Sequence, residues 1–151
     1  MRSEELLHSR VLLAEDNPAL VANLTEILEG LGYEVRSATT VREALGKAEG
    51  WVDVGLVDVK LPDGDGIELA AQLKETNPDC EVVLLTGFAS VESAAAAVRA
   101  GAWAYLIKPC ATPDLLLTIE QAFKQTRALA EKRELTHRAE VAERLAVVGT
   151  L

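Results

Sequence analysis

The chain has 151 residues, of which 49% are hydrophobic and 26% are charged, as in a folded globular protein. Its net charge of −9 argues against direct binding of nucleic acid, because phosphate contacts require clustered Lys and Arg side chains. No apolar stretch approaches the roughly 20 residues that span a membrane, and residues 1–9 lack a signal-peptide core. Cys80 and Cys110 have no metal-type spacing, so we expect two free thiols in a cytoplasmic protein.

Short apolar runs alternate with helical patterns along the chain. The segments that predict strands are 11–14, 33–38, 54–58, 81–86 and 104–108, and among them 33–38 alternates like a less buried strand. The patterns that predict helices are 17–32, 40–48, 66–76, 90–102 and a last helix that starts near Thr112. Asn17 followed by Pro18 is a typical helix start, because Asn caps the first amides and Pro suits the first turn.

The order of these elements predicts the fold class. Five β-then-α units favour an α/β protein with a doubly wound parallel sheet and helices on both faces, because right-handed crossovers place helices on each side. Three of the strands are continuous apolar runs, as expected for a sheet covered on both faces. A closed barrel would need about eight such units.

The last predicted helix is unusually long. From Pro113 it contains no further Pro and no Gly until Gly149, so it runs for roughly 35 residues, about three times the average helix. Small and apolar residues recur at heptad-like steps, at Leu135, Ala139, Ala142, Ala146 and Gly149. We therefore expect residues 126–151 to form an extended linker helix that dimerises as a weak parallel coiled coil.

Polar side chains stand where the predicted strands end. Glu15 and Asp16 follow the first strand, and Asp58 ends the third in the segment GLVDVKLPDGDG. Thr86 and Lys108 end the fourth and fifth. Ligands of open parallel sheets bind at this edge, so the five groups should converge there. Clustered carboxylates repel each other unless a cation joins them, which favours Mg²⁺, and Asp is a known covalent nucleophile that forms an aspartyl phosphate.

The segment from about Arg10 to Lys124 resembles the receiver domain of two-component response regulators, through VLLAEDN, VDVKLPDGDG, VVLLTGFAS and GAWAYLIKP. The resemblance implies a flavodoxin-like receiver over residues 10–125, with strand order 2-1-3-4-5. It also implies that Asp58 accepts a phosphoryl group from the phosphohistidine of a cognate histidine kinase or phosphotransfer protein. The groups that it assigns to Mg²⁺ are Glu15, Asp16, Asp58 and the backbone carbonyl of Lys60. It makes Thr86 and Lys108 partners of the phosphoryl group, Tyr105 an aromatic switch, and the Lys108–Pro109 bond cis.

The chain departs from the family pattern at Glu15, where Asp is commoner, at Lys60, where Met is common, and at Cys110, where Phe is frequent. None of these departures removes a required group. The tail segment AERLAVVGTL resembles the start of the dimerisation helix of histidine kinases, which implies an N-terminal piece of a receiver–kinase hybrid. The alternatives are the receiver of a response regulator with a DNA-binding or ATPase output domain, or a dimerisation module that is independent of phosphate.

Overall fold

The computed structural model describes residues 9–149, and the side chains of residues 9–145. The expected N-terminal tail, apart from Ser9, lies outside this range. The elements in chain order are β1 (Arg10–Ala14), α2 (Pro18–Gly30), β2 (Glu34–Ala38), α3 (Val41–Ala48), β3 (Val54–Asp58), β4 (Lys60–Leu61), β5 (Gly64–Asp65), α4 (Gly66–Thr76), β6 (Glu81–Thr86), α5 (Val91–Arg99), β7 (Ala104–Ile107) and α6 (Thr112–Gly149).

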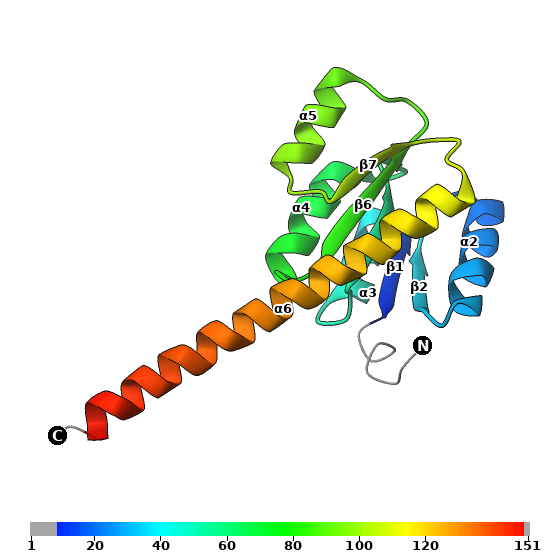
Figure 1. Cartoon of the computed structure of the whole chain (residues 1–151). Coiled ribbons are helices and arrows are strands. Elements are labelled where there is room, and N and C mark those ends of the chain that lie inside the picture. The colour runs from blue at the N-terminus through cyan, green and yellow to red at the C-terminus, as the bar shows by residue number, and fades with distance from the viewer. Residues whose placement is uncertain (1–8, 150–151) are drawn as a thin grey trace.

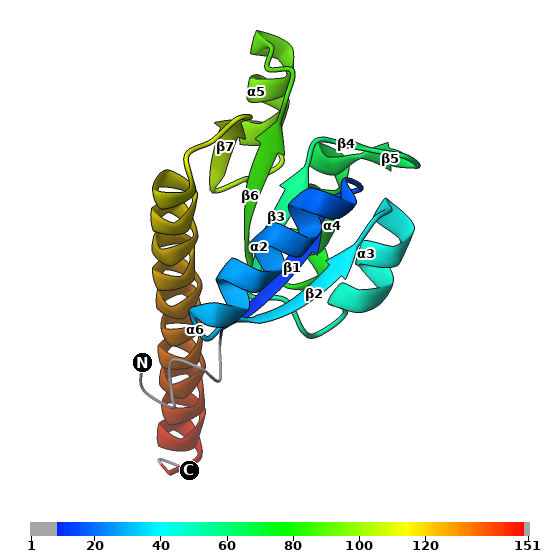
Figure 2. The same cartoon turned by 90° about the vertical axis from the view of Figure 1, so that its right-hand side faces the viewer.

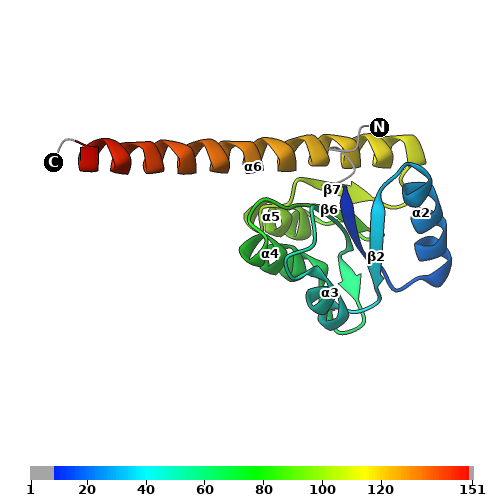
Figure 3. The ribbon, with the colours of Figure 1, turned by 90° about the horizontal axis from the view of Figure 1, so that it is seen from below.

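The five predicted strands form one parallel sheet in the order β2-β1-β3-β6-β7. When these five strands are numbered along the chain, the order is 2-1-3-4-5, so the predicted doubly wound topology is confirmed. Helices cover both faces (Figures 1 and 2). Seen from below, α6 and α2 lie on one side of the sheet and α3 and α4 on the other (Figure 3).

Alternation along the strands explains how one sheet fills two cores. In β1, Val11 and Leu13 belong to the core formed with α2 and α6, whereas Leu12 and Ala14 belong to the core formed with α3 and α4. Successive side chains of a strand point to opposite faces, so a strand with helices on both sides must be apolar throughout. This is why the buried strands read as continuous apolar runs in the sequence.

The helix starts follow the predicted capping rules. The side chain of Asn17 accepts from the amides of Ala19 and Leu20 at the start of α2, and Thr40 accepts from the amide of Glu43 in α3. Each bond satisfies an amide that has no partner within the helix. One element was not predicted, namely the short antiparallel hairpin β4–β5, which pairs Lys60–Leu61 with Gly64–Asp65.

Both cysteines are free thiols, as expected. Cys80 is buried at the start of β6, and this burial raises the pKa of its thiol to about 12. It is therefore protonated at neutral pH and behaves as a small apolar side chain of the core.

Helix α6 has 38 residues and confirms the predicted long helix. Its first part is held on the sheet by Leu115, Ile119, Ala122 and Phe123, which are buried in the core shared with α2. Its second part leaves the domain as a straight rod (Figure 1). Every described side chain from residue 131 to residue 145 is exposed, including the predicted heptad positions up to Ala142. The side chains of Ala146 and Gly149 lie outside the described part of the chain.

Two further contacts attach α6 to the domain. The ring of Phe123 stacks on that of Tyr33, with centroids 4.8 Å apart and planes inclined by 6°. Three turns later, Arg133 Nη2 lies 2.8 Å from Asp79 Oδ1 in the loop between α4 and β6. The aromatic contact is buried and the ion pair is exposed, so the core residues contribute most to holding the helix.

Replacing Phe123 with Ala should destabilise the domain, because it removes a side chain that is only 2% exposed and also loses the stacking on Tyr33. We expect the free energy of unfolding in urea to fall by about 3–5 kcal/mol. Leu135→Ala, on the exposed part of the same helix, is the matched control and should change stability by less than about 0.5 kcal/mol in dilute protein. Equal effects of the two substitutions would contradict this account of how α6 is attached.

Candidate functional site

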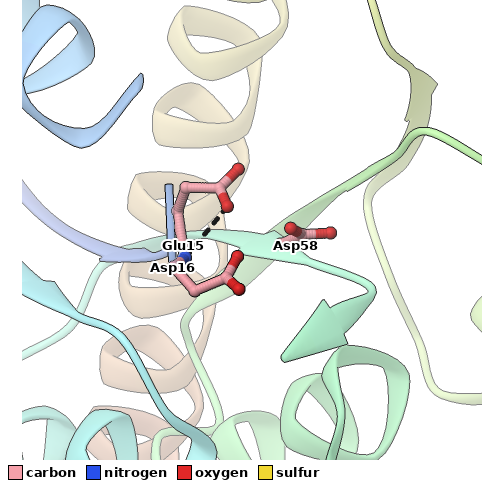
Figure 4. Close-up of side chains that lie close together, drawn as sticks. All are labelled: Glu15, Asp16 and Asp58. Carbon is pink, nitrogen blue, oxygen red and sulfur yellow. Dashed lines mark hydrogen bonds between the residues drawn. The ribbon is translucent and has the colours of Figure 1, made fainter. Parts of the chain in front are cut away.

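Three carboxylates gather at the carboxyl edge of the sheet. Glu15 and Asp16 follow β1, and Asp58 is the last residue of the neighbouring strand β3 (Figure 4). One oxygen from each carboxylate lies within 4.8 Å of the others. The convergence predicted from the strand ends is therefore present for these three acids.

Glu15 is the most deeply fixed of the three acids. It is only 2% exposed, and its Oε2 accepts from the backbone amides of Asp16, at 2.9 Å, and Asn17, at 3.2 Å. Its Oε1 accepts from Lys108 Nζ at 2.6 Å. A buried carboxylate is stable only when its oxygens are paired, and here both are.

Asp58 is 9% exposed and is also held through both oxygens. Oδ1 accepts from the backbone amide of Lys60 at 3.1 Å, and Oδ2 accepts from Lys108 Nζ at 3.2 Å. On its carbonyl side the chain runs very close to Gly66, where a Cβ would lie 2.0 Å from the Asp58 carbonyl oxygen. The amide of Gly66 donates to the carbonyl of Val59 at 2.8 Å, so this close approach fixes the turn that follows the phosphoacceptor candidate.

The Lys108 ammonium bridges Glu15 and Asp58 from the end of β7. Partial burial alone lowers the pKa of this ammonium. The hydrogen bond to Glu15 and the charge of Asp58 outweigh that effect, so its pKa is raised above the ordinary lysine value. Lys108 is therefore a permanent positive charge at neutral pH. The Lys108–Pro109 peptide bond is cis, as expected.

Thr86 and Tyr105 occupy neighbouring strands on the same side of the molecule. Thr86 ends β6 and is buried, and its Oγ1 accepts from the amide of Phe88 at 3.1 Å. Tyr105 is half-buried on β7, and its hydroxyl hydrogen-bonds the hydroxyl of Ser93 in α5. Lys60 is exposed, with its Nζ 5.9 Å from the centre of the Phe88 ring. That the backbone carbonyl of Lys60 binds a metal ion remains a prediction.

The sequence reasoning missed two residues that shape this site. Gly66 reads in the sequence as a helix-start glycine, and only the 2.0 Å approach to the Asp58 carbonyl reveals why a side chain cannot fit there. Ser93 reads as a surface helix residue, yet it is the hydrogen-bond partner of Tyr105. For Gly66, the available signal was a glycine that directly follows an acid-rich turn. No sequence signal pointed to Ser93.

The charges of the site favour a divalent cation. Three carboxylates and one ammonium leave two uncompensated negative charges within a few ångströms. Hard divalent ions with oxygen ligands neutralise such clusters, and Mg²⁺ in particular is often held by one or two carboxylates together with water and phosphate oxygens. The donor set of Glu15, Asp16 and Asp58 therefore fits Mg²⁺.

Comparison with known proteins identifies the family. A family model described as "Response regulator receiver domain" matches residues 11–120, well over half of the chain. The chain belongs to the response regulator receiver family. Receiver domains are phosphorylated by histidine kinases or phosphotransfer proteins, and they bind Mg²⁺ at an acidic pocket of the kind formed here by Glu15, Asp16 and Asp58.

Curated relatives share this receiver. The transcriptional regulatory protein ZraR of Escherichia coli (strain K12) is 35% identical over 120 residues, which are 79% of this chain and 27% of ZraR. The C4-dicarboxylate transport transcriptional regulatory protein DctD of Pseudomonas aeruginosa is 34% identical over 144 residues, which are 95% of this chain and 31% of DctD. The chain thus spans about a quarter to a third of the length of these relatives.

Solved receiver structures share the fold. A CheY-like receiver protein from Methanospirillum hungatei JF-1 superposes with a TM-score of 0.76 at 36% identity, over 80% of this chain and 97% of that one. The beryllofluoride-activated NtrC4 receiver domain dimer superposes with a TM-score of 0.73 at 39% identity, over 78% of this chain and 98% of that one. A Burkholderia pseudomallei response regulator with a phosphorylated aspartic acid, calcium ion and citrate superposes with a TM-score of 0.70 at 33% identity, over 82% of this chain and 72% of that one.

These comparisons do not confirm the kinase-like reading of the tail. ZraR and DctD are named as transcriptional regulatory proteins, and neither is named as a kinase. Neither the coiled coil nor the dimer is confirmed by them. Among residues 9–149, no helix combines the length and the apolar character needed to cross a membrane.

Gly66→Ala should disrupt the receiver locally, because the added methyl group would overlap the Asp58 carbonyl oxygen. We expect a fall in stability of at least about 1–3 kcal/mol, the usual range for overpacking. Gly46→Ala is the control, because it lies within helix α3 with open space around it and should stabilise the protein by about 0.5–1 kcal/mol. Thermal and urea unfolding of the two variants measure the contrast, and equal stability of the two would contradict the close approach at Gly66.

Proposed function

We propose that Asp58 is the phosphoacceptor of a two-component signalling receiver. The observation that carries this proposal is the Lys108 ammonium shared between Glu15 and Asp58, beside a third carboxylate. A carboxylate that is held at the end of a buried strand, with a fixed cation and room for a divalent ion, has what phosphoryl transfer requires. That reaction depends mainly on positioning and on neutralising the phosphoryl oxygens.

In the proposed reaction a carboxylate oxygen of Asp58 attacks the phosphorus of a phosphohistidine on the partner. An O–P bond forms, the P–N bond breaks, and the imidazole leaves with the bonding electron pair. Glu15, Asp16, Asp58 and the Lys60 carbonyl would hold Mg²⁺, which supplies charge neutralisation when it is bound. Lys108, whose Nζ lies 3.2 Å from Asp58 Oδ2, would turn from the Asp58 carboxylate to a phosphoryl oxygen.

We further propose that Thr86 and Tyr105 report the phosphorylated state. A new phosphoryl group attracts hydroxyl donors, so Thr86 would exchange its bond with the Phe88 amide for one to the phosphoryl oxygen. Tyr105 would then move inward beside Thr86 and give up its bond to Ser93 in α5. The change at Asp58 would thereby reach the surface formed by α5 and β7.

The output of this receiver is proposed from its relatives and its last helix. The names of ZraR and DctD support a parent that regulates transcription through a further domain, and the kinase hybrid is the second possibility. In either parent, α6 would join the receiver to its effector and pair with α6 of a second copy from about residue 128 onward. The exposure of every described side chain from residue 131 to residue 145 supports this proposal, because it leaves the stripe on this part of the rod in Figure 1 accessible to a second helix.

Asp58 is expected to be the only residue phosphorylated by acetyl phosphate with Mg²⁺. Intact-mass spectrometry should show one added phosphoryl group in the wild-type chain and none in Asp58→Asn. Asp114→Asn, an exposed acid in the first turn of α6, is the matched control and should be labelled like the wild type. Labelling that persists in Asp58→Asn would sink the assignment.

Dimerisation should depend on the exposed part of α6. Sedimentation over a concentration series should show a weak dimer of the wild-type chain, and Leu135→Glu should shift it to monomer by placing like charges in the pairing stripe. Leu117→Glu changes an equally exposed leucine near the root of the same helix and should leave the dimer intact. If Leu117→Glu abolished the dimer and Leu135→Glu did not, the interface would lie on the receiver itself. A wild-type chain that stays monomeric at high concentration would contradict the coiled-coil proposal.

A further inference from the structure

The hairpin β4–β5, which directly follows Asp58, is tied to a helix far away in the sequence. Asp63, at the tip of the hairpin, accepts from the amide of Val41 through Oδ1 at 2.7 Å and from the amide of Arg42 through Oδ2 at 3.1 Å. These are two of the amides at the start of α3 that have no partner within the helix. The two bonds lower the pKa of the exposed Asp63 carboxyl, because they stabilise its ionised form.

Other contacts hold the same hairpin against α3. A Cβ at Gly64 would lie 3.2 Å from the Val41 side chain, so the hairpin and the helix start are in close contact. Leu61 is buried in the core formed with α3 and α4, and Val41 packs against that core. Asp63 and Gly64 thus both meet the first turn of α3, and Leu61 belongs to the core against which Val41 packs.

The other end of the hairpin reaches the phosphoacceptor. The amide of Lys60, its first residue, donates to Asp58 Oδ1 at 3.1 Å. Asp65, its last residue, caps α4 by accepting from the amide of Ile67 at 2.8 Å. Among the described residues, the base of this segment is also bonded to β6, where the amide of Val59 donates to the carbonyl of Leu85 at 2.9 Å. The tip of the segment is bonded to another element through the Asp63 carboxylate.

We propose that Asp63 is a positioning residue for the phosphorylation site. By fastening the tip of the hairpin to α3, it sets the backbone of Lys60, whose amide holds Asp58 and whose carbonyl is the proposed fourth ligand of Mg²⁺. This inference rests on the proposed function, and it adds a residue that lies outside the acid cluster and touches neither the metal site nor the phosphoryl group. It also makes the start of α3 a part of the site's support.

A purely structural cap would have a different consequence. Thr40 also caps α3, by accepting from the amide of Glu43 at 3.0 Å, but it does not belong to the hairpin. Loss of either cap removes a bond from the start of α3, whereas only loss of Asp63 releases the hairpin. Thr40→Ala is therefore the matched control for Asp63→Ala.

The test measures Mg²⁺ binding by calorimetry and, separately, the Mg²⁺ concentration that gives half-maximal labelling by acetyl phosphate. Asp63→Ala should weaken both by about 10-fold, the lower end of the effect of removing a group that orients a metal ligand. Asp63→Asn keeps one carbonyl oxygen that can accept from either amide, so it should recover part of the loss. Thr40→Ala should lower the melting temperature yet leave both Mg²⁺ values within about twofold of the wild type. Asp16→Asn, which removes a proposed ligand itself, should have a larger effect than any of them.

The outcomes separate this inference from the proposed function. If the wild-type chain binds Mg²⁺ but is never labelled, the phosphoacceptor role fails, and the calorimetric comparison of Asp63→Ala with Thr40→Ala still decides the positioning role. Wild-type Mg²⁺ affinity in Asp63→Ala would overturn the inference, and so would equal losses in Asp63→Ala and Thr40→Ala.

Discussion

The interaction on which this receiver site depends is the repulsion between three carboxylates that lie close together at one edge of the sheet. Glu15 and Asp58 stand at the ends of the two central strands β1 and β3, each of which is hydrogen-bonded to neighbours on both sides. The sheet thereby fixes the backbone of these two residues side by side, and hydrogen bonds to Lys108 and to nearby amides hold their carboxylates. Lys108 offsets part of the repulsion, and its pKa is raised because two acids share it. The remaining negative charge favours a divalent ion at this site.

The sequence predicted the parts of this fold that depend on local pattern. Continuous apolar runs identified three of the five strands, because a strand buried on both faces has no polar positions to interrupt it, whereas β2 was identified by its alternation. The strand ends then predicted that Glu15, Asp16 and Asp58 would meet, since parallel strands bring their carboxyl ends to one edge. The long last helix followed from the absence of Pro and Gly over most of its length.

The parts that were not predicted depend on contacts between distant residues. Asp63 reads as a turn residue in the sequence, and its role at the start of α3 depends on amides 21 and 22 positions earlier in the chain. Gly66 is required by the path of the backbone at Asp58, and Ser93 by the position of Tyr105 on the next strand. None of these pairs follows a helical or strand period, so no periodic pattern could reveal them.

Helix α6 converts small movements at its root into large ones at its far end. An α-helix rises about 1.5 Å per residue, so Gly149 at the far end of α6 lies roughly 35 Å along the helix from Thr126, the last buried residue among its described side chains. A tilt of about 10° at the root would move the far end by about 6 Å. The ion pair between Arg133 and Asp79 is exposed and can resist such a tilt by only about 0–1 kcal/mol, so the direction of the rod is set by the buried residues from Leu115 to Thr126. Those residues pack on β3 and β6, the strands that end in Asp58 and Thr86, so the helix is seated on the same two strands that carry the proposed site of phosphorylation.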